Sequence, residues 1–323
     1  MLETVPGGQA PDGWLKITTV DAHTAGEPFR VITGGWPELK GETILARRRE
    51  MIARWDHLRT ALMWEPRGHA DMYGCIVTPP VSAGADFGVL FLHNEGYSSM
   101  CGHGIIAVTT AAVEAGLVPL RAPETTVKID APAGPITAHA KIKDGHVADV
   151  RFENVPSFAL ELDVRVEVPG YGCITYDLAY GGAFYAYVDA AAVGLTTTPA
   201  DVDGLITAGR AIKSAVMTAR EIPHPFEDDL SFLYGTIFVG APLDEGAHSR
   251  NVCIFAEGEV DRCPTGTGVS GRLAIHHARG EIGSGEPMVV ESIIGSRFTG
   301  RIVETTTFGP YPAVIPEIEG SAH

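Results

Sequence analysis

Basic residues are scarce in this chain of 323 residues, where 24 lysines and arginines stand against 40 aspartates and glutamates and the net charge is −16. This balance argues against nucleic acid or an anionic membrane as a partner, because both attract basic patches. No segment has the roughly 20 consecutive apolar residues of a membrane span. Residues 1–14 lack the basic start and apolar core of a signal peptide, so we expect a flexible N-terminus on a cytoplasmic protein.

Cysteine is sparse as well. The five cysteines are an odd number, and no two of them form a C-x-x-C pair. Reduced thiols in a cytosolic protein are the simplest interpretation. The H-E-x-x-H pattern of many zinc enzymes is missing, and His276 and His277 are adjacent rather than four apart. The spacing therefore predicts no metal site.

Apolar residues make up 45% of the chain and charged residues 20%, which is typical of a globular protein long enough for two domains. Hydrophobic periodicity predicts strands and helices in the same order in both halves. Arg47, Arg48 and Arg49 fall within the first expected helix and are interpreted as a solvated face. In the first half we expect strands at 15–22, 73–77 and 87–93, helices at 42–62 and 101–116, and a meander over 127–152; in the second half, strands at 170–176, 183–188, 232–239, 252–256, 288–291 and 298–303, and helices at 199–217 and 265–278.

Two of the expected helices begin with the same glycine motif. Residues 100–104 read MCGHG and residues 263–268 read CPTGTG, so that Cys101 aligns with Thr265, 164 positions later. A second pair of landmarks, Gly134 and Gly295, lies 161 positions apart. Two pairs of similar positions separated by nearly the same number of residues indicate a duplicated domain. Ligand sites are often found in the cleft between two domains.

A helix start with two glycines exposes backbone N–H groups and the positive end of the helix dipole, which suits a carboxylate or phosphate. A thiol at such a position loses its proton more easily, so we interpret Cys101 as reactive rather than structural. His103, on the first helical turn, either packs there or hydrogen-bonds a substrate. Asp261 either caps the helix or pairs with Arg262, or it binds a substrate ammonium group.

Two other patterns leave alternatives open. Gly266–Gly271 fits G-x-G-x-x-G, and Glu291 follows 20 residues later, as in a dinucleotide site. That pattern would make the chain an NAD-dependent oxidoreductase. A single NAD site, however, accounts for only one of the two glycine motifs, whereas a pair of anion-binding sites accounts for both. Cys263 is either a packing residue or a displaced second thiol. His69, Asp71 and His224 are interpreted as structural.

Five stretches spread along the chain resemble the proline racemase superfamily. The resemblance implies the fold shared with diaminopimelate epimerase: an α/β (α+β) chain with two pseudo-symmetric domains, each a curved, mostly antiparallel sheet around a central helix, and an active site in the cleft between them. It assigns residues 15–153 to the first domain and 154–307 to the second, with 308–323 returning to the first. The stretches are HTAGEP at 23–28, RGHADM at 67–72, MCGHG at 100–104, YGGAFY at 180–185 and DRCPTGTG at 261–268.

The resemblance also implies roles for individual residues. Racemases and 4-hydroxyproline epimerases of this superfamily carry a cysteine in both motifs, whereas this chain has Thr265 in the second, like the branch that dehydrates trans-3-hydroxy-L-proline. Cys263 stands where many members have serine. Cys101 is then the base, and Asp261 binds the ring ammonium group of a small-molecule substrate, without a cofactor. The same resemblance suggests a homodimer. Residues expected to hold the substrate, largely through backbone N–H groups, are Gly102, His103, Gly266 and Thr267.

Threonine in the second motif changes the expected reaction. A two-base racemase needs two groups that titrate near neutral pH, and a threonine hydroxyl does so only with a neighbouring base. No such base is evident beside Thr265 in the sequence. The alternatives are an epimerase or racemase that uses Cys263 as its second thiol, the NAD-dependent oxidoreductase, and an amino-acid-binding protein without catalysis.

Overall fold

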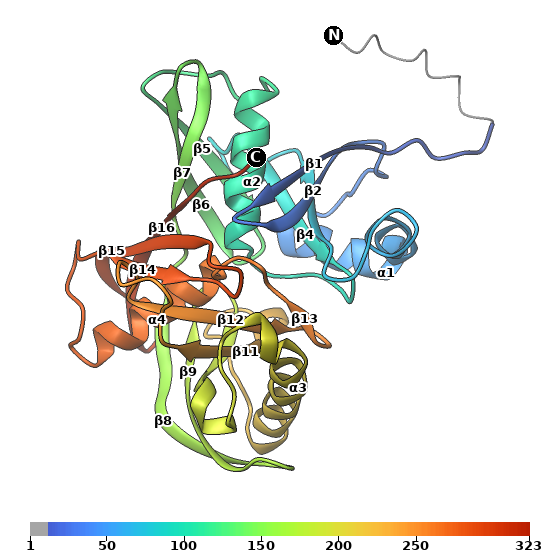
Figure 1. Ribbon diagram of the computed structural model, residues 1–323. Coiled ribbons are helices and arrows are strands. Elements are labelled where there is room, and N and C mark those ends of the chain that lie inside the picture. The colour runs from blue at the N-terminus through green and yellow to red at the C-terminus, as the bar shows by residue number, and fades with distance from the viewer. Residues whose placement is uncertain (1–11) are drawn as a thin grey trace.

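The computed structural model describes residues 12–323 (Figure 1), so most of the predicted flexible N-terminus, residues 1–11, lies outside the described chain. A path of fifteen hydrogen-bonded strands runs through the whole molecule, with β13 paired to β12 at its side. Two central helices, α2 and α4, lie within the two halves of this path. Among the described helices, none is both long and apolar enough to cross a membrane.

The predicted elements occur in the predicted order, with boundaries shifted by a few residues, and the structure adds further strands, among them 158–168 and 311–320. Three single-turn 3-10 helices complete the described chain in the second half. In chain order the strands and α-helices are β1 (Thr18–Thr24), β2 (Glu27–Gly34), α1 (Ile44–Met63), β3 (Tyr73–Thr78), β4 (Phe87–His93), α2 (Gly102–Glu114), β5 (Glu124–Ala131), β6 (Gly134–Lys143), β7 (His146–Glu153), β8 (Phe158–Val168), β9 (Gly172–Tyr180), β10 (Phe184–Asp189), α3 (Val202–Ala219), β11 (Leu233–Gly240), β12 (Ser249–Phe255), β13 (Glu259–Val260), α4 (Gly266–Ala278), β14 (Met288–Glu291), β15 (Arg297–Phe308) and β16 (Tyr311–Gly320).

The two halves share one pattern of strand pairing. In the first half β1 and β2 are antiparallel, β2 and β3 parallel, β3 and β4 antiparallel, β4 and β5 parallel, and β5, β6 and β7 antiparallel. In the second half β9 to β12, β14, β15 and β16 repeat these relations in the same order. The predicted α/β fold with two pseudo-symmetric domains is therefore confirmed.

Each central helix is apolar on nearly every side, as expected of a helix enclosed by protein. Ten of the thirteen residues of α2 are buried, and so are ten of the thirteen of α4. Helix α2 packs against β1, β2, β6 and β7, and α4 against β8, β9, β15 and β16. The curled sheets thus hold both helices firmly and fix where their N-termini point.

Strand β16 joins the two halves, because it pairs with β15 on one edge and with β7 on the other. Beyond it, the backbones of His23 and His323 exchange two hydrogen bonds of 2.8 and 2.9 Å. The end of the described chain therefore lies beside β1, at the His23–Thr24 end of that strand (Figure 1).

The arginines of α1 correct the prediction of a solvated face. Arg48 is buried and donates to the carbonyl of Tyr97 at 3.0 Å. Arg49 reaches the second half and pairs with Asp229 at 2.7 Å. The prediction was wrong for Arg48, because a guanidinium group can be buried where backbone carbonyls accept its protons, whereas Arg49 is exposed as predicted.

Candidate active site

Helices α2 and α4 begin against each other. A Cβ atom placed on Gly102 would lie 2.6 Å from the Cα of Gly266, and one placed on Gly266 would lie 2.9 Å from the Cα of Gly102. No real side chain tolerates such a distance, so glycine is required at both positions for the helices to approach this closely. Two sets of free N–H groups and two positive helix ends therefore meet in one place.

Cys101 precedes α2 in an extended conformation and is buried. Its Sγ accepts the N–H of Gly104 at 3.3 Å, which caps the helix. The same Sγ lies 3.4 and 3.5 Å from the two ring nitrogens of His103. The thiol is thus in direct contact with an imidazole, a contact that two residues of sequence spacing did not predict.

The protonation of this pair differs from the sequence expectation. Burial, and then the charge of Asp261, raise the pKa of the Cys101 thiol well above its ordinary value, although the bond from the Gly104 N–H acts in the opposite direction. The expected easy loss of the proton is therefore wrong, because desolvation outweighs the helix terminus. Burial lowers the pKa of His103 to about 3, so its imidazole is neutral.

Thr265 precedes α4 with a positive φ of 66°, which a β-branched residue adopts rarely. Its Oγ1 donates to Asp261 Oδ2 at 2.5 Å. The expectation of no base beside Thr265 is thus wrong, because the loop folds the carboxylate back onto the hydroxyl. Burial raises the pKa of Asp261 to about 7, against the bond from Thr265, which lowers it.

Glu27 is a second buried carboxyl group to which the sequence interpretation gave no role. Its Oε2 accepts the N–H of Arg262 at 2.6 Å, across the two halves. Its Oε1 has no hydrogen-bond partner among residues 12–323. Burial and then Asp261 raise its pKa well above the ordinary value. Its position in the HTAGEP stretch was the available signal.

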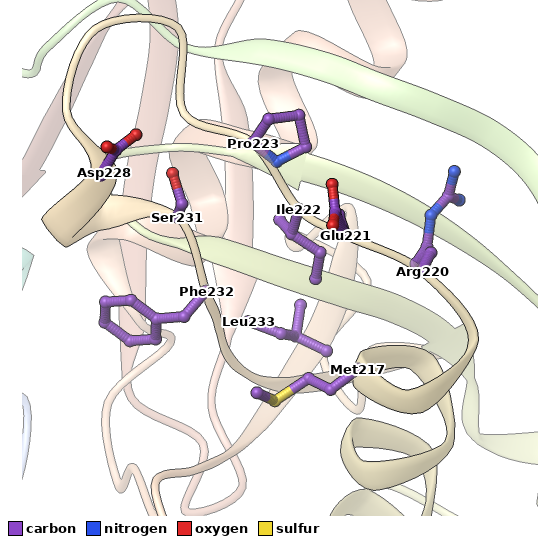
Figure 2. A pocket seen from close by; sticks show the side chains of 9 residues that line it. All are labelled: Met217, Arg220, Glu221, Ile222, Pro223, Asp228, Ser231, Phe232 and Leu233. Carbon is purple, nitrogen blue, oxygen red and sulfur yellow. The ribbon is translucent and has the colours of Figure 1, made fainter.

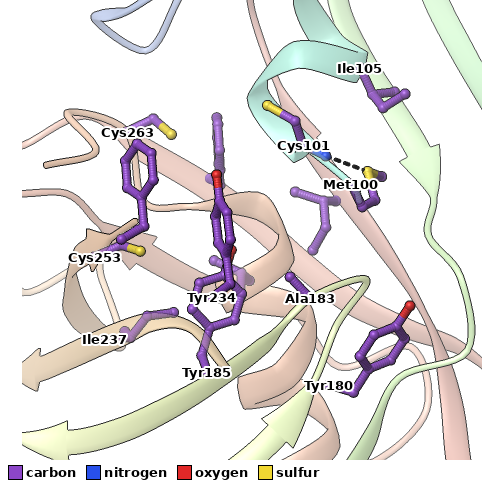
Figure 3. Close-up of a cluster of buried hydrophobic side chains, with 14 of the residues drawn as sticks. Met100, Cys101, Ile105, Tyr180, Ala183, Tyr185, Tyr234, Ile237, Cys253 and Cys263 are labelled. Atoms are coloured by element: carbon purple, nitrogen blue, oxygen red, sulfur yellow. Dashed lines mark hydrogen bonds between the residues drawn. The ribbon is translucent and has the colours of Figure 1, made fainter. Parts of the chain in front are cut away.

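Aromatic side chains close the remaining sides. The hydroxyl oxygens of Tyr73 and Tyr234, one from each half, lie 3.0 Å apart. Tyr185 and Thr267 share a hydrogen bond of 2.8 Å between their hydroxyl groups. Figure 3 shows Tyr185 and Tyr234 in one buried cluster with Cys101. In the sequence these tyrosines read as ordinary strand residues, so they were missed.

The cavity between these groups holds only about 10 Å³, roughly one water molecule. All seven predicted site residues line it. The structure therefore brings together residues from both halves, although their roles stay predictions. The lining consists of Tyr73, Met100, Cys101, Gly102, His103, Tyr185, Tyr234, Phe255, Asp261, Thr265, Gly266 and Thr267.

A larger hollow, of about 400 Å³, lies between the end of α3 and β11 (Figure 2). Its lining includes Arg220, which is held by Glu161, and the exposed side chain of Met217. No thiol or histidine lines it. We therefore place the candidate active site at the two helix starts, where the thiol, imidazole and carboxyl groups lie, and not in this larger hollow.

The proline racemase family model matches residues 19–323. The chain belongs to the proline racemase family. It is 51% identical to the trans-3-hydroxy-L-proline dehydratase of Colwellia psychrerythraea over 97% of this chain and 88% of that protein. It is 50% identical to the 3-hydroxyproline 2-epimerase of Burkholderia multivorans over 95% and 92%. The crystal structure of a hydroxyproline epimerase from Agrobacterium vitis with bound trans-4-hydroxy-L-proline has a TM-score of 0.91 at 34% identity, over 95% and 90% of the chains.

The structure of this proline racemase family member leaves little room for the dinucleotide interpretation. Glu291, the expected ribose acceptor, accepts the N–H groups of Leu243 and Asp244 and pairs with buried Arg250. The start of α4 meets Gly102, so the phosphate position of a dinucleotide site is covered. Both observations disfavour Gly266–Gly271 as a NAD site.

The remaining candidates make contacts within the protein. Asp71 accepts the N–H of Val260 at 3.0 Å and so ties the two halves together. His69 lies beside it, with Nδ1 2.6 Å from the carbonyl oxygen of Ala70. His224 packs against Tyr180, away from the cavity. Cys263 is buried beside the site, where its Sγ accepts the N–H of Thr265 at 3.4 Å.

Proposed function

We propose that this protein dehydrates trans-3-hydroxy-L-proline to pyrroline-2-carboxylate without a cofactor, as a hydro-lyase. The observation that carries the proposal is the unequal pair of helix starts, with a thiol at Cys101 and a hydroxyl at Thr265. Family membership and the name of the Colwellia relative support it.

Binding would use both charges of the amino acid. The substrate carboxylate accepts hydrogen bonds from the N–H groups at the starts of α2 and α4, with Gly102, Gly266 and Thr267 contributing. The ring ammonium group lies against Asp261, with the carboxyl group of Glu27 nearby. His103, being neutral, offers one N–H donor and one acceptor to the substrate or to Cys101.

The ammonium group would also prepare the base. Burial and, after it, the charges of Asp261 and Glu27 hold the Cys101 pKa high. A positive charge bound between these groups offsets that effect, so the pKa of the thiol falls when substrate arrives. The thiolate is thus formed where the Cα proton is presented.

One residue can then serve two steps. In trans-3-hydroxy-L-proline the hydroxyl group and the Cα hydrogen are on the same face of the ring. The Cys101 thiolate takes the Cα proton, and the electron pair left on Cα is stabilised through the carboxylate by the helix ends. The C3–O bond then breaks as the new thiol passes its proton to the leaving hydroxyl, which departs as water. The resulting enamine tautomerises to pyrroline-2-carboxylate.

Thr265 would not act as a second base. Its hydroxyl donates to Asp261, and in the proposed complex that carboxylate is paired with the ring ammonium group, so it does not take the threonine proton. In this role Thr265 positions the carboxylate that binds the ammonium group. Return of a proton to the opposite face of Cα is thereby prevented.

The proposal is tested with purified protein and no added cofactor. Trans-3-hydroxy-L-proline, trans-4-hydroxy-L-proline and L-proline are incubated separately in deuterated water and followed by proton NMR. We expect conversion of the 3-hydroxy substrate to a pyrroline product and no epimerisation or racemisation of the other two. A stable 3-hydroxy substrate would contradict the proposal.

A second candidate is an epimerase or racemase that uses Cys263 as the second thiol. Ligand atoms of Cys263, His103 and Asp261 lie within 4.8 Å of one another, so this thiol is near the site. The 3-hydroxyproline 2-epimerase of Burkholderia multivorans is 50% identical. In the same NMR experiment, deuterium at Cα of an epimerised product would favour this candidate.

Location, assembly and domain boundaries complete the proposal. We infer a cytoplasmic enzyme that forms a homodimer, with residues 15–153 and 154–307 as its two domains and 308–323 added to the first. Light scattering on the purified protein tests the dimer, and a monomeric mass would contradict it.

A further inference from the structure

Four side chains with metal-binding atoms lie close together at the two helix starts, and three of them, Cys101, His103 and Asp261, line the cavity. Ligand atoms of His103, Asp261 and Cys263 lie within 4.8 Å of one another, and all three residues are buried. Cys101 adds a fourth, because its Sγ is 3.4 Å from a ring nitrogen of His103. We propose that this cluster binds a soft divalent cation of the zinc type, which occupies the cavity when substrate is absent and blocks turnover.

The donor set and its geometry suit such an ion. Zinc takes thiolate, imidazole and carboxylate ligands at about 2.0–2.3 Å in a tetrahedral arrangement, which places neighbouring ligand atoms roughly 3.3–3.8 Å apart. The ligand atoms of His103, Asp261 and Cys263 need to approach one another by about 1.5 Å at most. His103 and Cys101 come from the start of α2, and Asp261 and Cys263 from the segment before α4. The ion would therefore link the two halves.

The volume of the cavity and the charge of the groups around it also favour a bound cation. A cavity of about 10 Å³ has room for a single ion once the ligand side chains move closer, whereas a pyrrolidine ring requires the halves to separate. Asp261 and Glu27 are both fully buried beside it, and Glu27 Oε1 lacks a hydrogen-bond partner among residues 12–323. A cation compensates these carboxyl groups in the way that the ring ammonium group does when substrate is bound.

Binding is a simple exchange of protons for metal. The two thiols lose their protons to solvent, two sulfur–metal bonds form, and no group is oxidised or reduced. The bound ion uses the same Cys101 and Asp261 atoms that the substrate needs, so it inhibits by competition. Magnesium prefers an octahedron of oxygen ligands and is not expected to compete.

The test compares wild type with Cys263→Ser and with Cys173→Ser, a control that removes an exposed thiol. Each protein is freed of metal with a chelator and titrated with Zn²⁺ or Mg²⁺, and each inhibited rate is divided by that protein's own uninhibited rate. We expect Zn²⁺ to inhibit wild type and Cys173→Ser equally. In Cys263→Ser the inhibitory concentration should rise at least about tenfold, because even changes outside the ligand shell cost about 10–100-fold in metal affinity.

A second measurement does not need turnover. Cd²⁺ is added to wild type without substrate, and the ultraviolet sulfur-to-cadmium charge-transfer absorption is recorded. We expect one equivalent to bind, with a band that persists in Cys173→Ser and weakens in Cys263→Ser. Absence of the band in wild type, or equal zinc inhibition of all three proteins, would overturn the metal site. The band is read without any reaction, so failure of the proposed dehydratase activity is a separate result.

Discussion

Helices α2 and α4 start at equivalent places in the two halves, yet the residue before each helix is used differently. Cys101 has an extended backbone, and its side chain caps its own helix through the Gly104 N–H. Thr265 has a φ of 66°, and within the described chain its hydroxyl makes no capping bond to α4. That hydroxyl is directed instead to Asp261.

This difference distinguishes the anion-binding backbone groups, which both halves have, from the acid–base side chain, which only one half has. In the proposed mechanism the anion is held by backbone N–H groups and helix dipoles, which do not depend on the side chain of residue 101 or 265. The base of that mechanism is one side chain, Cys101, on one side of the site only. A duplicated domain can therefore keep a symmetric binding site while its chemistry becomes asymmetric.

The sharpest way to break the comparison is Cys101→Ser, which makes both helix starts hydroxyl-bearing. We expect turnover to fall on the order of 10²–10⁴-fold, the usual contribution of a positioned acid–base group, because serine does not ionise near neutral pH. Thermal unfolding should change little, since the hydroxyl can still accept the Gly104 N–H. Cys173→Ser, at an exposed thiol, is the matched control and should keep full activity. A fully active Cys101→Ser protein would refute the mechanism.

Gly102→Ala tests the contact that both halves share. The new methyl group would lie 2.6 Å from the Cα of Gly266, so the two helix starts must separate. We expect a loss of stability of about 1–3 kcal/mol and a fall in kcat/KM of about 100-fold, because a displacement near 1 Å disturbs the bound substrate. Denaturant unfolding and steady-state kinetics measure these changes.

Gly283→Ala is the control for that substitution, because its Cβ would meet one carboxylate oxygen at 3.9 Å. It should leave kcat/KM unchanged. Equal kinetics for Gly102→Ala and Gly283→Ala would mean that the contact between the helix starts does not position the substrate.

Thr265→Cys makes the two helix starts alike. We expect the variant to gain slow epimerisation with deuterium uptake at Cα, because a thiol can return a proton to the second face of the ring. Proton NMR in deuterated water with trans-4-hydroxy-L-proline detects it. Thr265→Ser keeps the hydroxyl and should show none. If Thr265→Cys also shows none, residue 265 does not occupy the second-base position.

The smallest expected effect concerns the stability of the charged pocket. The pKa of Asp261 is about 7 in the folded chain, against an ordinary value of 3.8 for an aspartate. Between about pH 4 and pH 7 the unfolded chain releases this proton and the folded chain keeps it, so this residue makes stability fall as pH rises through that window. Asp261→Asn removes the dependence and should raise the Tm at pH 7 by at least about 2 °C, roughly 1 kcal/mol.

Asp201→Asn tests a carboxyl group whose effect on stability changes with pH in the opposite direction. Hydrogen bonds from Thr196 lower the pKa of Asp201, so its carboxylate stabilises the folded state above its unfolded pKa. The variant should lose stability relative to wild type as pH rises above about 4. Parallel pH–Tm curves for wild type and Asp261→Asn would show that Asp261 has an ordinary pKa.

The sequence was sufficient to predict those features of the fold and the site that depend on neighbouring residues or on a motif present in both halves. The glycine motifs and their offset of 164 residues predicted two helix starts in equivalent positions, and the structure places Gly102 against Gly266. The seven predicted residues line one cavity for the same reason, since each lies within four residues of one of the two helix starts.

What the sequence could not predict depends on the surroundings of a group. Glu27 meets the N–H of Arg262 across 235 residues, and Tyr73 meets Tyr234 across 161. The pKa of Cys101 follows from burial and from nearby carboxyl groups, neither of which spacing reveals. Asp261 and Thr265 are close in sequence, but their bond requires the positive φ at Thr265.

The position of β16 has a consequence for the order in which the molecule is made. Strand β7 ends at Glu153, and its partner on the outer edge begins at Tyr311, 158 residues later. At about 5–20 residues per second, a ribosome needs roughly 10–30 s to deliver that partner. During this interval β7 offers an unpaired edge, the feature through which nascent chains associate wrongly. The first half is thus finished by a strand made long after β7, and the growing polypeptide depends on protection of that edge until β16 has emerged.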